Sequence, residues 1–171
     1  MCDSNTFEMP NINKWKNVEW ISCQIGQCRL QINVKKNFEF YEAATNITTN
    51  CNCQNCIFYT NEIINLENDF FETLKNFNVD LTKQYEKPHE KIKCVSDSNE
   101  NKIRYLANYF VFGKIGKTQK STKKTDIEGN VIEVTCNYQG IGNHVQLTIK
   151  RVNEEKLDFE IYIIADKKIL E

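Results

Sequence analysis

Apolar and polar residues alternate strictly from Cys28 to Val34, a period of two that is typical of a half-buried β-strand. Residues 18–25, which precede this segment, are rich in β-branched and aromatic side chains. Gly26-Gln27 between the two segments suits a two-residue hairpin turn. Residues 38–43 have a third strand-like composition. Because parallel neighbours would need crossover helices, we expect these three strands to form an antiparallel meander.

One segment has the period of an α-helix. From Ile63 to Phe77, apolar residues recur at steps of three and four, which predicts a helix with one apolar stripe. Asn78 then suits the left-handed conformation that often follows a helix, with Val79 closing back onto the last turn. Asp80 is expected to cap a further short turn. We therefore expect this segment to be the principal helix of the fold.

The second half of the chain is dominated by strand patterns. Residues 103–115 form a long apolar and aromatic run, which predicts a strand that is buried on both faces or bent at Asn108. Three further strands are expected at residues 130–138, 144–152 and 157–164, with connections short enough for hairpins. This order predicts an α+β fold, with a mainly antiparallel sheet of about six or seven strands and one principal helix packed on it.

The length and charge of the chain restrict its partners. Its 171 residues fit a single domain, with residues 1–16 as an N-terminal arm and residues 113–129 as a lysine-rich loop. The formal net charge is −1, which gives no overall field to attract nucleic acid or an anionic membrane. The lysine-rich loop also contains no arginine and no aromatic residue of the kind that stacks on bases. We therefore expect neither nucleic acid nor a membrane as a partner.

The sequence also bears on the location of the chain. No apolar run reaches the ~20 residues that a membrane-spanning helix needs. Met1 to Asn5 carries no basic region followed by an apolar core, so we expect no signal peptide. A cytoplasmic location is therefore expected, with the eight cysteines as reduced thiols.

Cys51, Cys53 and Cys56 form the most specific local pattern in the sequence. The two-residue gap between Cys53 and Cys56 lets both thiolates reach one metal ion from a tight turn, and Cys51 is close enough to add a third ligand. Cys94 or His89, which follow the predicted helix, would supply a fourth. Zinc suits such a set, because it is tetrahedral and accepts sulfur and nitrogen ligands. The second C-x-x-C pair of a zinc ribbon is absent, so three unconnected thiols are the alternative.

The same cysteines also suit thiol chemistry, because a cysteine at the start of a helix has a lowered pKa. A thioredoxin-like site would need a strand–helix–strand unit and a cis-proline loop, for which Pro88 is the candidate. Gly116-Lys117-Thr118 resembles part of a phosphate-binding loop, but Val111 stands where that motif needs glycine. No other catalytic constellation stands out, so we do not expect an enzyme.

Further spacings connect the cysteines to the segments that follow them. The cysteine knuckle precedes a helix that ends in Phe77-Asn78-Val79-Asp80, and the aromatic strand Tyr109-Phe110-Val111-Phe112-Gly113 comes later. In these features the middle third of the chain resembles a loose group of uncharacterised small bacterial proteins. The resemblance implies that the cysteines form one unit, and it implies no activity.

An ordinary core, many aromatic residues and near-zero net charge favour a non-enzymatic domain that binds another protein. Immunity or inhibitor proteins of bacterial toxin and defence systems are domains of this kind. The alternatives are a zinc-binding structural domain with a cysteine knuckle and a thiol-dependent redox enzyme.

Overall fold

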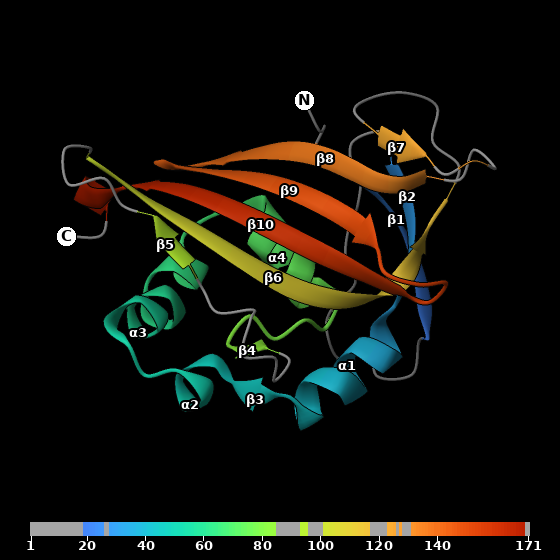
Figure 1. Cartoon of the computed structure of the whole chain (residues 1–171), viewed down its shortest axis with the longest axis horizontal. Coiled ribbons are helices and arrows are strands. Elements are labelled where there is room, and N and C mark those ends of the chain that lie inside the picture. Colours follow the sequence, from blue (N-terminus) through green and yellow to red (C-terminus); the bar gives the residue numbers. More distant parts are fainter. Residues whose placement is uncertain are drawn as a thin grey trace.

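The computed structural model describes residues 19–25, 28–84, 93–95, 101–116, 123–125, 127 and 131–169. These residues form an α+β fold around one antiparallel sheet (Figure 1), which confirms the predicted fold class. Within them the sheet has eight strands, in the order β1-β2-β6-β10-β9-β8-β7, and β5 pairs with β6 off this path. The predicted N-terminal arm, residues 1–16, lies outside the described residues.

The strands of the sheet are β1 (Trp20–Ile25), β2 (Cys28–Asn33), β5 (Lys93–Val95), β6 (Lys102–Ile115), β7 (Lys123–Thr125), β8 (Val131–Gly140), β9 (Asn143–Arg151) and β10 (Lys156–Asp166). A two-stranded sheet pairs β3 (Thr45–Asn46) with β4 (Lys83–Gln84). The helices are α1 (Val34–Ala43), α2 (Ile47–Asn50), α3 (Gln54–Asn61) and α4 (Asp69–Asn76), with 3₁₀ turns at Ile63–Asn65 and Lys167–Ile169. In Figure 1, α4 lies behind β6 and β10, and α1 to α3 lie along one side. β5 and β7 were not predicted, because three residues are too few to show an alternating pattern.

The N-terminal hairpin forms as predicted. β1 and β2 pair antiparallel, and every second residue of β1 is buried. The prediction of a third strand at residues 38–43 is wrong, because these residues belong to α1. Asn33 ends β2 and caps α1, since its Oδ1 accepts a hydrogen bond from Lys36 N at 2.9 Å. The buried residues of α1 are Val34, Asn37 and Tyr41, whose spacing of three and four is helical.

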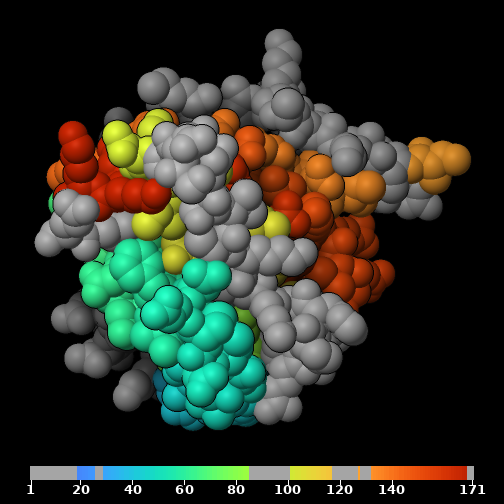
Figure 2. All heavy atoms as spheres, turned by 60° about the vertical axis from the view of Figure 1, so that its left-hand side comes forward, coloured from blue at the N-terminus to red at the C-terminus, as the bar shows by residue number. Residues whose placement is uncertain are grey.

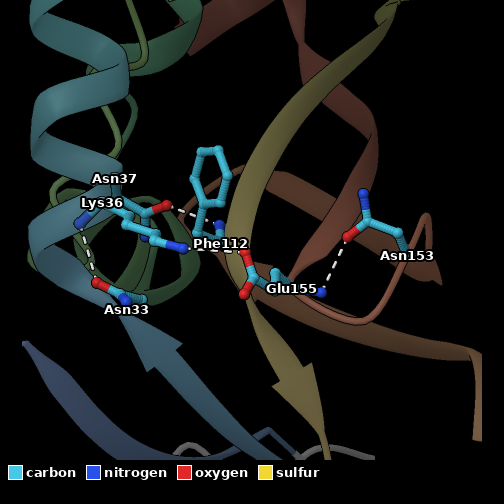
Figure 3. A network of polar contacts seen from close by, with 6 residues as sticks. All are labelled: Asn33, Lys36, Asn37, Phe112, Asn153 and Glu155. Carbon is cyan, nitrogen blue, oxygen red and sulfur yellow. Dashed lines mark hydrogen bonds and ion pairs between the residues drawn. The ribbon is translucent and has the colours of Figure 1, made fainter.

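Side chains of α1 and β4 form hydrogen bonds with the backbone of β6 between its pairings with β5 and β2. Tyr41 Oη donates to the carbonyl of Phe110 at 2.7 Å, and Gln84 Nε2 donates to the carbonyl of Asn108 at 3.2 Å. The N–H of Phe112 donates to Asn37 Oδ1 at 2.7 Å (Figure 3). These three contacts stand where a neighbouring strand would otherwise bond, so the middle of β6 needs no strand on this side.

Figure 3 also shows an ion pair between Lys36 of α1 and Glu155, in the turn between β9 and β10, at 2.9 Å. Glu155 is held in that turn because its N–H donates to Asn153 Oδ1 at 2.9 Å. Both charged side chains are largely exposed, so the pair orients α1 more than it stabilises the fold.

β6 is half buried, which corrects the prediction of burial on both faces. Its residues alternate between buried and partly exposed from Tyr105 to Gly113. The strand changes partner at Gly113, pairing with β10 up to Phe112 and with β2 from Gly113 onwards. A Cβ at Gly113 would lie 2.6 Å from the carbonyl oxygen of Gln31, so the close approach of β2 requires glycine there.

The predicted helix from Ile63 to Phe77 is divided into two parts. Its first residues form a 3₁₀ turn, and α4 begins after Asn68, whose Oδ1 accepts from Phe70 N at 2.9 Å. The predicted end of the helix is confirmed. Asn78 has φ 62°, and the N–H of Val79 donates to the carbonyl of Leu74 at 3.1 Å, as in a Schellman motif.

Asp80 caps the next turn as predicted, since its Oδ1 accepts from Thr82 N at 3.0 Å. The buried face of α4, Phe70, Phe71 and Leu74, packs against the sheet, with the Phe70 and Tyr138 rings 5.1 Å apart.

The C-terminal strands also follow the prediction. β8, β9 and β10 form two consecutive hairpins, and the first turns at Gly142 with φ 65°. The predicted lysine-rich loop is partly strand, because Gly113–Ile115 belong to β6 and Lys123–Thr125 form β7. Across the parts of the chain that the structure describes, every helix is too short or too polar to cross a bilayer.

A candidate metal centre of three cysteines

The three predicted cysteines lie where two short helices meet. Cys51 follows α2, and its N–H donates to the carbonyl of Ile47 at 2.9 Å. Cys53 is extended and holds the N-cap position of α3, with φ −66° and ψ 159°. Cys56 lies in the first turn of α3. The chain folds this way locally because Ile47 and Cys56 are both buried and fix the two helices against the core.

The sulfur atoms of Cys51, Cys53 and Cys56 all lie within 4.8 Å of one another. With Zn–S bonds of about 2.3 Å, tetrahedral coordination places two sulfurs about 3.8 Å apart. Closing the cluster around a metal would therefore need movements of about 1 Å at most, which side-chain rotation supplies. Three of the five predicted ligands are thus brought together by the fold.

The three thiols differ in exposure. Cys53 is exposed, Cys51 is half-buried and Cys56 is only 1% exposed. None of the five cysteines whose side chains the structure describes, which include Cys23 and Cys136, forms a disulfide. The cluster therefore has one sulfur that faces solvent and one that faces the core, with the third between them.

The pKa values of two of these thiols move in opposite directions. The backbone N–H of Cys56, followed by the thiols of Cys51 and Cys56, lowers the pKa of Cys53 to about 7. Burial, followed by its two cysteine neighbours, raises the pKa of Cys56 to about 12. Near neutral pH, the exposed sulfur is therefore partly a thiolate while the buried one keeps its proton.

Buried tyrosines hold α3 against the sheet. The hydroxyls of Tyr59 and Tyr109 lie 2.7 Å apart, and Tyr109 Oη donates to the carbonyl of Leu81 at 2.7 Å. The ring of Phe58 stacks on that of Tyr105 at 6.3 Å. These residues were not predicted as supports of the site. The only signal was that aromatic residues directly follow the cysteine knuckle.

A surface hollow of about 460 Å³ lies beside the cysteine cluster, between α3 and the first part of β6. Apolar side chains that line it include Ile57, Phe58, Ile103 and Tyr105. Ile57 is 41% exposed, which is high for an isoleucine on a helix that packs against a core. Figure 2 shows the α2–α3 segment, coloured teal, at the surface of the molecule.

The predicted fourth ligand is not placed by the structure. His89 and the side chain of Cys94 lie outside the described residues. The backbone of Cys94 is in β5 and pairs with Tyr105 of β6, the residue on which Phe58 of α3 stacks. Among the described side chains, the three cysteines are the group of metal-ligating atoms that lies close together. A scan against protein-family models, a search of curated proteins and a search of solved structures each found no match for this chain.

Proposed function

We propose that this chain is a zinc-binding domain in which Cys51, Cys53 and Cys56 coordinate one Zn²⁺ ion. The observation that most supports this is the distance of at most 4.8 Å between their sulfur atoms. Zn²⁺ binds thiolates well and is usually held by four ligands in structural sites. The cluster provides three of these, one of which is already partly a thiolate near neutral pH because the pKa of Cys53 is lowered to about 7.

The role of the metal is structural. α2 has four residues and α3 has eight, and helices of this length are marginal without tertiary support. A shared metal ion would join the end of α2 to the first turn of α3. Because a site of this kind does not exist in the unfolded chain, the binding free energy of the metal adds to the stability of the fold.

Cys94 or His89 would complete the tetrahedral set. The pairing of the Cys94 backbone with Tyr105 supports this choice, because Tyr105 contacts α3 through both Phe58 and Tyr59. His89 precedes this strand by a few residues in the sequence. The identity of the fourth ligand decides whether the site is Cys₄ or Cys₃His.

Metal analysis tests the proposal. Protein purified without added zinc is expected to contain one equivalent of zinc, and a chelator is expected to lower its melting temperature. Cys53→Ala and Cys56→Ala should each lose the metal. Cys136→Ala is the matched control, since Cys136 is also a buried cysteine without a disulfide but lies on β8. A substoichiometric metal content together with a melting temperature that is insensitive to chelator would refute the proposal.

Cobalt substitution identifies the fourth ligand. Co²⁺ replaces Zn²⁺ in tetrahedral thiolate sites, and its charge-transfer absorption grows with the number of sulfur ligands. We expect either Cys94→Ala or His89→Ala to change this spectrum, and the other variant to leave it unchanged. A cobalt spectrum that neither variant alters would mean that neither residue is a ligand.

Recognition of another protein, as by an immunity or inhibitor protein, is the second candidate function. The exposed Ile57, beside an apolar hollow, is the observation that favours it. If the surface around Ile57 binds another protein, that protein should co-purify with the chain in a stoichiometric amount from its native cells. Ile57→Asp should abolish the association without changing the zinc content. If the Ile57→Asp variant still bound the partner, the surface around Ile57 would be excluded as the binding site.

A further inference from the structure

We propose that the cysteine cluster also undergoes reversible disulfide exchange, in which Cys53 reacts first with a low-molecular-weight disulfide and Cys56 then closes an internal bond. The exchange itself is independent of the proposed function. Its effect on a bound metal ion rests on the proposed function.

The difference in exposure sets the order of the two steps. Cys53 is exposed at the start of α3, so a disulfide of the size of oxidised glutathione can reach its sulfur. Cys56 is 1% exposed, so the same molecule cannot approach it directly. The Sγ of Cys56 nevertheless lies within 4.8 Å of that of Cys53, so the two sulfurs must approach by at most about 2.8 Å to form a bond of about 2.05 Å.

The external disulfide is the only oxidant that the exchange needs. The Cys53 thiolate attacks one sulfur of the external disulfide, forms a mixed disulfide and releases one thiolate. The Cys56 thiol loses its proton to solvent and attacks the Cys53 sulfur, which releases the second thiolate. Two protein thiols are thereby oxidised to one disulfide, and one external disulfide is reduced to two thiols.

The backbone favours Cys56 over Cys51 as the second residue. Cys53 is the N-cap residue of α3 and Cys56 is the third helical residue, and the side chain of an N-cap residue is directed towards the backbone of the second or third helical residue. Cys51 is extended, with φ −151° and ψ 113°. Two residues of extended chain span up to about 7 Å, at the upper limit for the Cα atoms of a disulfide.

Formation of this bond removes two of the three clustered thiolates at once. A disulfide sulfur is a poor ligand for Zn²⁺, because the metal binds the thiolate form. Oxidation should therefore release the zinc ion of the proposed metal site, and reduction should restore binding. The exposure of Cys53 makes the metal content dependent on the thiol–disulfide balance around the protein.

The first part of the test uses the full chain in its reduced, metal-free form. It is treated with oxidised glutathione, its remaining thiols are alkylated, and its cysteines are mapped by fragmentation mass spectrometry. We expect a bond between Cys53 and Cys56. Cys56→Ala should accumulate glutathione on Cys53, while Cys53→Ala should carry none at Cys56. Cys51→Ala should still form the bond and serves as the control for folding.

Some outcomes of this mapping would overturn the exchange. A bond between Cys51 and Cys53 would do so, and so would glutathione on Cys56 in the Cys53→Ala variant. The wild-type map decides the question even if one of the variants fails to fold.

The second part of the test uses zinc-loaded protein and a chromogenic zinc chelator. Oxidised glutathione is expected to release the bound zinc in parallel with formation of the bond. If the bond forms while the zinc stays bound, the proposed link between oxidation and metal release is wrong. If the protein takes up no zinc at all, the metal proposal fails, and the mapping of metal-free protein still decides whether exchange occurs.

Discussion

The two buried tyrosines beneath α3 allow a quantitative prediction. Tyr109 uses its single hydroxyl proton on the carbonyl of Leu81, so Tyr59 must be the donor in the 2.7 Å contact between the two hydroxyls. Both rings are almost completely buried. Tyr109→Phe therefore leaves two buried groups without partners, the Tyr59 hydroxyl and the Leu81 carbonyl, whereas Tyr59→Phe leaves only a spare lone pair on Tyr109.

The magnitudes follow from this difference. A buried group left unsatisfied costs about 1–3 kcal/mol, so Tyr109→Phe should lower the free energy of unfolding by about 3 kcal/mol. Tyr59→Phe loses one hydrogen bond and should cost about 1 kcal/mol. In the double variant only the Leu81 carbonyl lacks its partner. Its cost should be about 1–3 kcal/mol, which is less than the sum of about 4 kcal/mol for the two single variants.

Urea denaturation of the metal-free protein, followed by circular dichroism, measures all three values. The metal-free form is used because bound zinc would add its own stabilisation to each variant. The reasoning would be refuted if Tyr59→Phe cost more than Tyr109→Phe, or if the two costs were additive. Either result would mean that the hydroxyls do not form the chain from Tyr59 through Tyr109 to Leu81.

Three further predictions concern the backbone and the thiols. Asn78→Ala should destabilise the protein by about 1 kcal/mol more than Asn78→Gly, because φ is 62° and both variants lose the same bond to the Val34 carbonyl; equal unfolding free energies would contradict this. Gly113→Ala should cost about 1–3 kcal/mol, because its Cβ would lie 2.6 Å from a backbone oxygen. Gly116→Ala should cost less, because its Cβ would lie 3.2 Å from the carbonyl oxygen of Arg29. If Gly116→Ala unfolded at a lower urea concentration than Gly113→Ala, steric crowding at Gly113 would not be the cause of the cost. The rate of alkylation of Cys53 in metal-free protein should rise with pH around a midpoint near 7, since the pKa of this thiol is lowered to about 7. Mass spectrometry of the modified peptide at a series of pH values measures this rate. A midpoint near pH 9 would mean that the pKa of Cys53 is not lowered.

The sequence predicted the elements that have regular periods and obvious ends. The β1–β2 hairpin, the three C-terminal strands and the Asn78 helix end were all predicted, because each depends on nearby residues. Residues 38–43 were misread as a strand because their composition is strand-like, whereas the cap at Asn33 and the burial of Asn37 and Tyr41 make them helical. The contacts of Asn37 and Tyr41 with the β6 backbone join residues far apart in the sequence, so strand-like composition alone could not indicate the helix.

At the candidate site, too, features set by nearby residues were predicted and features set by distant contacts were not. Cys51, Cys53 and Cys56 were predicted to lie together, and local spacing was enough for that prediction. The difference in burial between Cys53 and Cys56 was not predicted, because it depends on how α3 packs against the sheet. The Tyr59–Tyr109 contact joins residues 50 positions apart, so no local pattern could indicate it.

The side chains that bond to the middle of β6 also bear on the solubility of the protein. An unoccupied stretch of strand in the centre of a sheet is a template onto which a segment of a second molecule can add. Asn37 and Tyr41 of α1 and Gln84 of β4 occupy that position, so α1 and β4 together oppose the addition of a strand from a second molecule. Detachment of α1 would therefore expose the backbone of β6 at Phe110 and Phe112 to strand addition.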